Sequence, residues 1–279
     1  MELSKIRKVV RNFLLYGILT VLSAIFLIPI LWMISGSLKT NYQVFSFPIQ
    51  WIPNPPIWTN FHEGWTSKPF NTYLKNTLII TTCCVIGRIF VASLVGFGFA
   101  RLKFYGRDIL FVIVLASMIL PIHTTIIPLF VIYRYLGWIN TFKPLTIPTI
   151  LSSPFLIFFM RQFFLSLPSE LEAAARVDGC SSFGVYWRIY LPLAKPALAA
   201  LAIFVFMWSW NDFFLPLVVL SEDAKRTLVV GLVSMKDHYG GDWNLIMAVA
   251  VLITLPCIMV FIFAQKYFVK GITVGGIKG

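Results

Sequence analysis

Six long apolar runs separated by polar segments dominate the chain. A helix needs roughly 20 apolar residues to cross a bilayer core of about 30 Å, and runs of that length occupy residues 13–34, 76–100, 109–133, 144–165, 196–220 and 244–266. Three of the runs are interrupted by a charged residue, Arg88, Arg161 or Asp212. The pattern predicts an all-α, polytopic membrane protein with six transmembrane helices.

The first run follows a basic segment, so it resembles either a signal peptide or an uncleaved helix. Ser35-Gly36-Ser37 after it is a weak match to a cleavage site. The apolar region of a signal peptide is usually about 7 to 15 residues long, and the run at 13–34 is longer than that. We therefore predict an uncleaved first helix.

The composition agrees with a chain whose solvent is the bilayer. Of the 279 residues, 58% are hydrophobic and only 12% are charged, whereas soluble domains have about 25% charged residues. The cysteines show neither the spacing of a disulfide framework nor a C-x-x-C metal motif; they are Cys83, Cys84, Cys180 and Cys257. The sequence therefore predicts no metal site.

The net charge of +12 is explained by topology. Six spans leave both termini on one side, and 14 of the 23 Lys and Arg residues fall on that side, 8 on the other and Arg88 within the membrane. The positive-inside rule predicts that both termini are cytoplasmic, in a multi-pass protein of the cytoplasmic membrane. The basic residues then face anionic lipid, and no nucleic-acid partner is required.

The predicted spans divide the rest of the chain into loops. A cytoplasmic N-terminus covers residues 1–12, an external loop 35–75, and the membrane core 76–268, which includes a cytoplasmic loop at 168–195 and an external loop at 221–243; a cytoplasmic tail covers 269–279. The loop 35–75 is rich in Pro and Trp, which predicts an ordered segment at the membrane interface.

The last external loop contains an apolar run at 227–235, too short to span a membrane. This run is either a short helix packed on the external face or part of a lid. The residues that follow it, Tyr239, Gly240, Asp242 and Trp243, are candidates for contact with a partner outside the cell or with an entering ligand.

The loop 168–195 contains the clearest local signals. Ser169 followed by Glu172 has the spacing of a capping box and predicts a helix that begins after Ser169. Gly179 is the expected stop, because glycine adopts the left-handed conformation at little cost. The predicted helix has two to three turns and exposes small alanine side chains, with charges at Glu172, Arg176 and Asp178.

This loop resembles the signature loop of permease subunits of binding-protein-dependent ATP-binding-cassette importers. The resemblance rests on Glu172-Ala173-Ala174, on Gly179, and on Ile189 with Leu191-Pro192 after it. Further matches, between residues 72 and 279, resemble the sugar-uptake branch and in particular subunits similar to the maltose permease G protein; they include Ala100-Arg101-Leu102-Lys103-Phe104, Leu136-Gly137, Trp210-Asn211-Asp212-Phe213 and Ile277-Lys278-Gly279.

The resemblance implies a coupling helix that docks in a cleft of a separate ATPase subunit. The residues it assigns to that contact are Ser169, Glu172, Ala173, Ala174, Arg176, Asp178 and Gly179. It also implies a homologous second permease subunit, two ATPase subunits that bind ATP and Mg, an extracytoplasmic binding protein and a sugar substrate. The alternative from the residues alone is an amphipathic helix lying on the lipid surface.

The chain lacks the motifs of a nucleotide-binding subunit or an enzyme. It has no G-x-x-x-x-G-K-[ST] loop, no H-E-x-x-H and no G-x-S-x-G. Gly96-Phe97-Gly98 lies within a span, where close helix packing explains the glycines better than phosphate binding. We therefore predict no cofactor and no catalytic residues on this chain.

Charged residues within spans need partners or a water-filled cavity, because burying them in lipid is costly. Arg88 and Asp212 lie at similar depths in their spans, which suggests an intramembrane pair. Trp208 and Asp212 share a helical face, with Asn211 beside them and Phe204 one turn earlier. Such a face suits a sugar, although ordinary packing of aromatic residues in a membrane core explains it equally well.

Two transporter classes therefore remain open. The chain is either an importer permease driven by partner ATPases or a self-contained secondary transporter that uses Arg88, Asp212 and His123 as ion or proton couplers. The absence of a visible inverted repeat favours the first. Oligosaccharides, monosaccharides and glycerol phosphate esters all remain possible substrates.

Overall fold

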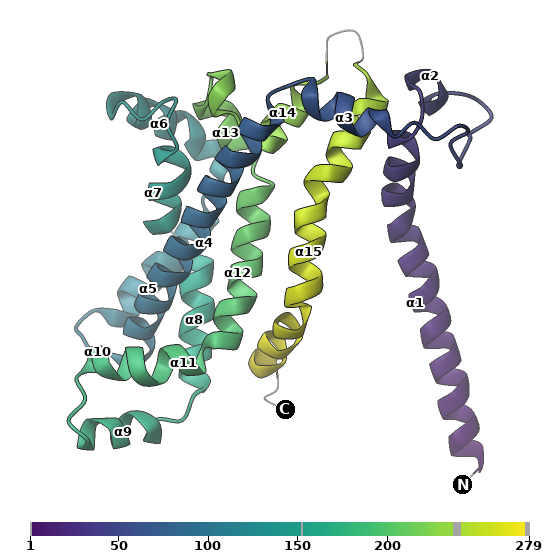
Figure 1. Ribbon diagram of the computed structural model, residues 1–279. Helices are drawn as coiled ribbons and strands as arrows, with labels where there is room; N and C mark the ends of the chain where they lie inside the picture. Colours follow the sequence, from purple (N-terminus) through teal and green to yellow (C-terminus); the bar gives the residue numbers. More distant parts are fainter. Residues whose placement is uncertain (1, 152, 237–240, 277–279) are drawn as a thin grey trace. The chain divides into compact units, whose positions relative to one another are not determined.

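The computed structural model describes residues 2–151, 153–236 and 241–276. In these ranges there is no β-strand, and 78% of the chain is helical, which confirms the all-α fold (Figure 1). The helices of six or more residues are α1 (Glu2–Ser37), α3 (Thr59–Thr66), α4 (Phe70–Arg101), α5 (Arg107–Ala116), α6 (Ile122–Tyr135), α7 (Lys143–Leu151), α8 (Pro154–Ser166), α9 (Glu170–Val177), α12 (Lys195–Trp210), α13 (Phe214–Val219), α14 (Leu228–Val233) and α15 (Trp243–Gly276).

Short helical segments connect them. These are α2 (Asn41–Val44), the 3₁₀ turns η1 (Ser117–Ile119) and η3 (Asp223–Lys225), α10 (Ser182–Val185), the π-helical turn η2 (Tyr186–Tyr190) and α11 (Leu191–Leu193).

Four helical stretches are long and apolar enough to cross a membrane, and two bent helix pairs raise the number to six if each pair is one span. The predicted span at 109–133 is not one straight helix, because α5 with η1 and α6 meet at an angle of 103°. Pro121 precedes α6 in an extended conformation. Proline lacks an N–H and disfavours a helical residue before it, which explains the break.

The predicted span at 196–220 is also interrupted. Helix α12 ends at Trp210, and α13 begins at Phe214. Asn211 is the C-cap of α12 and Phe213 is the N-cap of α13, so Asp212 lies in the break between the two helices.

The chain forms two compact units, residues 1–68 with 232–255, and residues 69–231 with 256–279. In the first unit, the segment after α1 is ordered as predicted. The Nδ2 of Asn60 donates to the backbone oxygens of Ser37 (2.9 Å) and Lys39 (2.8 Å). The Lys39 ammonium, which is fully buried, donates to the Gln50 carbonyl and lies 4.3 Å from the Trp32 ring centre. Burial lowers the pKa of Lys39.

In the second unit, α4 packs against α7, α8 and α12. A Cβ atom on Gly96 would lie 2.7 Å from the Cβ of Met160, so only glycine permits this approach of α4 to α8. Phe97 beside it packs against Phe164 and Tyr190, with ring centres 6.0 Å and 5.3 Å apart. The glycine cluster at 96–98 therefore serves helix packing at Gly96, as predicted.

The apolar run at 227–235 forms the short helix α14, one of its two predicted forms. The backbone N–H of Leu228 donates to the Thr77 hydroxyl of α4 at 2.9 Å. Leu228 and Val230 are buried, so this part of α14 is packed on the unit that contains α4.

We expect Gly231→Ala to destabilise the protein, because the added Cβ would lie 2.3 Å from a ring carbon of Tyr73. Overpacking of this kind costs about 1–3 kcal/mol. Thermal unfolding of the protein in detergent should show a lower midpoint. Gly98→Ala is the matched control, since no atom lies within 4 Å of its added Cβ. Equal midpoints for the two variants would contradict this account of the packing.

Candidate functional site

Helix α9 begins and ends where the sequence predicts, but its start is built differently. Ser169 precedes the helix in a helical rather than extended conformation, and its side chain makes no capping hydrogen bond. The predicted capping box is therefore wrong in detail. Instead, the Glu172 carboxylate accepts hydrogen bonds from the Nε (3.0 Å) and Nη2 (2.8 Å) of Arg176, a pair one turn apart that stabilises the helix.

The end of α9 confirms the role predicted for Gly179. Its φ of +79° is left-handed, a conformation that glycine adopts at little cost. The N–H of Gly179 donates to the Arg176 carbonyl (3.1 Å), and the N–H of Cys180 donates to the Ala175 carbonyl (2.9 Å). These two bonds form a Schellman motif, which stops the helix sharply after Asp178.

The two faces of α9 differ in exposure. Ala175 is buried in the core, and the Glu172 side chain is only 15% exposed. On the opposite face Ala173 and Ala174 are exposed, and Val177 is 88% exposed. The outer face of α9 therefore offers small apolar side chains that allow another surface to approach closely, with Asp178 exposed at the end of the helix.

Arg101 supports the loop that leads into α9, a role that the sequence analysis missed. It is the last residue of α4, and its Nη2 donates to the carbonyls of Phe164 (2.6 Å) and Leu167 (2.5 Å). Its guanidinium also lies 5.0 Å from the ring centre of Tyr190. Two carbonyls at the end of α8 and just after it thus accept hydrogen bonds from the last residue of α4. A charged residue directly after the predicted span at 76–100 was the available signal.

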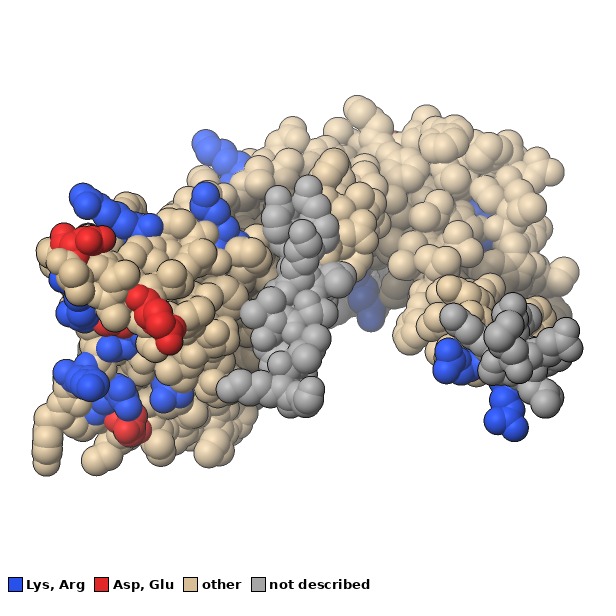
Figure 2. All heavy atoms as spheres, turned by 90° about the horizontal axis from the view of Figure 1, so that it is seen from below, with Lys and Arg blue, Asp and Glu red and all other residues tan. Residues whose placement is uncertain are grey.

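A groove of about 600 Å³ lies beside α9. The residues that line it are mostly charged or polar; they are Arg101, Leu102, Lys103, Phe104, Glu172, Arg176 and Ser182. Figure 2, which views the molecule from below, shows Lys, Arg, Asp and Glu side chains gathered on this end of the second unit. Three cations against one carboxylate make the groove electropositive.

A second cavity, of about 410 Å³, lies within the helices of the second unit. It will be called the bundle cavity. It is lined by Thr77, Ile80, Cys84, Arg88, Leu145, Thr149, Trp208, Ser209, Asp212, Leu215, Pro216 and Thr227. Its volume lies in the range of about 300–1,000 Å³ that is usual for small-molecule sites.

Arg88 and Asp212 both line the bundle cavity, but they form no direct ion pair. Arg88 Nε donates to the Thr149 carbonyl (2.9 Å) and the Ser153 hydroxyl (3.1 Å), while Asp212 lies in the break between α12 and α13. The two side chains therefore share a cavity without forming the predicted ion pair.

The predicted aromatic face is only partly assembled around this cavity. Trp208 lines it, and its ring centre lies 5.9 Å from that of Phe204 and 5.8 Å from that of Phe155. Phe204 is not among the lining residues. Asn211 is exposed, and its Nδ2 donates to the Met207 carbonyl at 2.8 Å, so it also does not line the cavity.

The candidate contact residues after α14 belong to the first unit. Asp242 is exposed, and Trp243 begins α15. The Trp243 N–H donates to the Asn41 side chain at 3.1 Å, and its ring packs edge to face with Phe45. Tyr239 and Gly240 lie outside the described residues, as does the side chain of His123.

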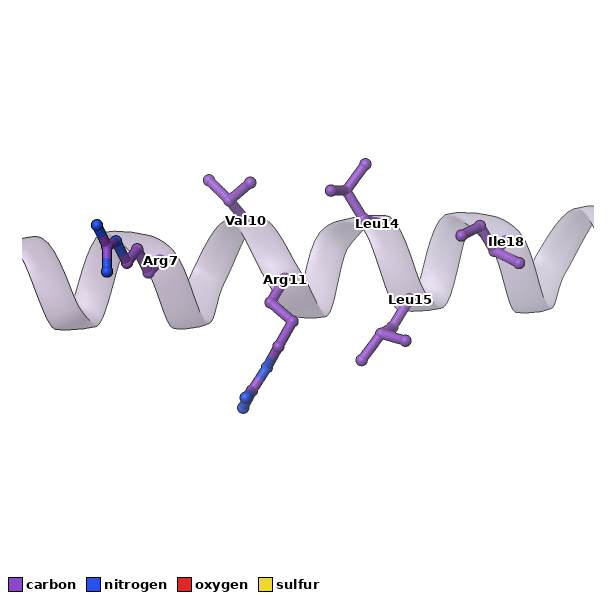
Figure 3. A pocket seen from close by; sticks show the side chains of 6 residues that line it. All are labelled: Arg7, Val10, Arg11, Leu14, Leu15 and Ile18. Carbon is purple, nitrogen blue, oxygen red and sulfur yellow. The ribbon is translucent and has the colours of Figure 1, made fainter.

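A shallow hollow on α1 provides no enclosed site. It is lined by Arg7, Val10, Arg11, Leu14, Leu15 and Ile18, which all belong to one helix (Figure 3). Both basic residues precede the run Leu14, Leu15 and Ile18, the arrangement expected where a helix enters a membrane from its positively charged side.

Comparisons with known proteins identify the family. An arabinooligosaccharides transport system permease protein of Bacillus subtilis is 36% identical over 261 residues, 92% of each chain. The diacetylchitobiose uptake system permease protein of Streptomyces coelicolor is 32% identical over 252 residues, 90% of this chain and 91% of its own. The sn-glycerol-3-phosphate transport system permease protein of Yersinia pestis is 31% identical over 267 residues, 93% of each.

A solved structure shows the same fold. It is a bacterial ABC transporter involved in the import of the acidic polysaccharide alginate, with a TM-score of 0.81 at 24% identity over 93% of this chain and 96% of that chain. Residues 88–274 match the family model described as the inner membrane component of binding-protein-dependent transport systems. The chain therefore belongs to this family of membrane permeases.

Proposed function

We propose that this chain is the permease subunit of an ATP-driven carbohydrate importer. It forms half of the translocation path, and a homologous second permease forms the other half. Two ATPase subunits bind ATP and Mg and supply the energy, and an extracytoplasmic protein delivers the sugar. The names of the relatives from Bacillus subtilis and Streptomyces coelicolor, which refer to oligosaccharide uptake, support carbohydrate as the substrate class.

The geometry of α9 is the observation that carries this proposal. A short helix with a small, exposed outer face suits a cleft in a partner protein better than a lipid surface, because helices on lipid carry large apolar anchors and a basic face. Glu172, Ala173, Ala174, Arg176 and Asp178 lie on this helix or at its end. ATPase closure acts on α9 and is transmitted to α4 through the Arg101 contacts.

The same proposal assigns the sides of the membrane. The end of the molecule with α9 and its basic groove faces the cytoplasm, together with both termini, in keeping with the positive-inside rule. The segment from α14 to the start of α15 then faces outward. There Asp242 and Trp243, with Tyr239 and Gly240 before them in the chain, contact the binding protein.

We expect Glu172→Lys to abolish ATP-driven uptake and the ATPase stimulation that accompanies it. The new lysine would lie beside Arg176, whose guanidinium now bonds to the Glu172 carboxylate at 2.8 Å. Like charges one turn apart destabilise a helix, so the outer face of α9 is no longer held in position for the ATPase. We expect the uptake rate to fall more than about tenfold, or 1.4 kcal/mol.

Asp108→Lys is the control for this charge reversal. Asp108 also pairs with an arginine, Arg107 at 2.9 Å, and is well exposed. Exposed pairs contribute about 0–1 kcal/mol, so uptake should persist. Wild-type uptake by the Glu172→Lys variant, with normal insertion of both variants, would count against α9 as the coupling element.

Reconstitution tests the proposed function as a whole. The purified complex of permeases and ATPases is placed in proteoliposomes, and uptake of arabinotriose, diacetylchitobiose and glycerol 3-phosphate is measured with and without ATP and the binding protein. We expect saccharide uptake only when both are present. Uptake driven by an ion gradient in liposomes that contain this chain alone would instead identify a secondary transporter, with Arg88 and Asp212 as couplers.

A further inference from the structure

We propose that the bundle cavity is a binding subsite for a neutral, hydroxyl-rich ligand, so that this subunit itself holds the sugar during its passage. This inference rests on the proposed carbohydrate import and adds to it a site within this chain. All residues that line the cavity belong to the second unit.

The first support is an unused hydroxyl. Thr227 is 5% exposed, and its Oγ1 has no hydrogen-bond partner among the described residues. Thr77, which lines the same cavity, is different, because its hydroxyl accepts from the Leu228 N–H at 2.9 Å. A buried hydroxyl without a partner is unfavourable, and a native fold normally satisfies such groups. Thr227 lines the cavity, so a ligand hydroxyl that reaches its Oγ1 would supply the missing partner.

The second support is the balance of charge in the cavity. Arg88 is fixed by the bonds of its Nε to Thr149 and Ser153, and among the described residues its terminal nitrogens have no acceptor. Asp212 lines the same cavity from the break between α12 and α13. Donors and a carboxylate thus face one space. Asp212 would repel an anionic ligand, and Arg88 would repel a cationic one. A sugar hydroxyl can donate a hydrogen bond to the Asp212 carboxylate and accept one from the Arg88 guanidinium.

The third support is the apolar wall. Trp208 is 46% exposed, and Phe155 and Phe204 hold its ring at centre distances of 5.8 Å and 5.9 Å. An aromatic face next to polar groups suits the C–H faces of a sugar ring. A few polar groups that converge on an apolar wall are typical of small-molecule sites.

Thr227→Val tests the site, with Thr81→Val as its matched control. Thr81 is also buried, at 2% exposure, and its Oγ1 also has no partner among the described residues, but it does not line the cavity. In proteoliposomes supplied with ATP and liganded binding protein, we measure arabinotriose transported per ATP hydrolysed. We expect this ratio to fall about fivefold for Thr227→Val and to be unchanged for Thr81→Val. A fivefold fall corresponds to the loss of one hydrogen bond of about 1 kcal/mol.

This ratio separates the subsite from the coupling machinery. Loss of a ligand contact leaves ATP hydrolysis running while less sugar passes, whereas damage to α9 lowers both rates. If uptake depends on ATP and the binding protein but Thr227→Val matches the wild type, the subsite is refuted and the import function stands. If no saccharide is imported at all, the proposed function itself fails.

Ligand class is tested directly on the purified complex without the binding protein. A ligand that binds the folded state raises the unfolding midpoint. We expect a rise with neutral saccharides, for which arabinotriose, maltotriose and diacetylchitobiose are the probes, and no rise with glycerol 3-phosphate. The rise should disappear in Thr227→Val and persist in Thr81→Val. An equal rise with the phosphate ester, or none with the saccharides, would overturn the proposal.

Discussion

Gly179→Pro should abolish ATP-driven uptake and uncouple ATP hydrolysis from the binding protein. Gly179 has a φ of +79°, whereas proline fixes φ near −65°, so the chain cannot leave α9 in its present direction. Proline also removes the N–H that donates to the Arg176 carbonyl at 3.1 Å. Strain at such a position costs on the order of 1–3 kcal/mol, and the outer face of α9 is presented at a different angle.

The matched control is Gly137→Pro, at the end of α6. Gly137 has a φ of +66°, and its N–H donates to the Arg134 carbonyl at 3.1 Å, as in α9. Both variants should lower the unfolding midpoint by a similar amount. Only Gly179→Pro should lose the stimulation of ATPase activity by liganded binding protein, measured in proteoliposomes. Loss of coupling in both variants, or in neither, would contradict a special role of α9.

Arg101→Ala should give the second large effect, because it removes a guanidinium that joins the ends of α4 and α8. Hydrogen bonds to charged groups contribute about 1.5–3 kcal/mol each, and Arg101 makes two, to Phe164 and Leu167. We expect a loss of about 3 kcal/mol or more in the free energy of unfolding, and uptake that falls together with ATPase stimulation.

Arg107→Ala is the control at the same end of the molecule. Arg107 pairs with Asp108, whose side chain is 74% exposed, and such pairs contribute about 0–1 kcal/mol. Denaturant unfolding in detergent and proteoliposome uptake are measured for both variants. If Arg101→Ala and Arg107→Ala lower uptake and stability equally, the contacts of Arg101 do not transmit force from α9.

The sequence was sufficient where one local signal decides the structure. Apolar runs predict the long helices, and Gly179 predicts the end of α9, because few other residues accept its backbone conformation. Gly96 likewise predicts close packing of α4. These features depend on properties of single residues or of short runs, which do not change with their tertiary surroundings.

Predictions were less complete for side chains that have several possible hydrogen-bond partners. Ser169 and Glu172 have capping-box spacing, but Arg176 takes the Glu172 carboxylate. Arg88 and Asp212 lie at similar depths, yet Arg88 bonds to Thr149 and Ser153 instead. Thr227 could not be found from the sequence, because only the fold of α14 against α4 places this residue at the cavity. Tertiary contacts decide such choices, and spacing along the chain does not record them.

The length of α4 has a mechanical consequence. Arg101 ends this helix and Thr77 lies 24 positions earlier, which at about 1.5 Å per residue separates them by about 36 Å. A tilt of about 5° about the Arg101 end would displace the backbone at Thr77 by about 3 Å, from the same helix geometry. That displacement is comparable to a hydrogen-bond length. A small rocking of one long helix is therefore enough to make or break the hydrogen bond from the Leu228 N–H to the Thr77 hydroxyl at the wall of the bundle cavity.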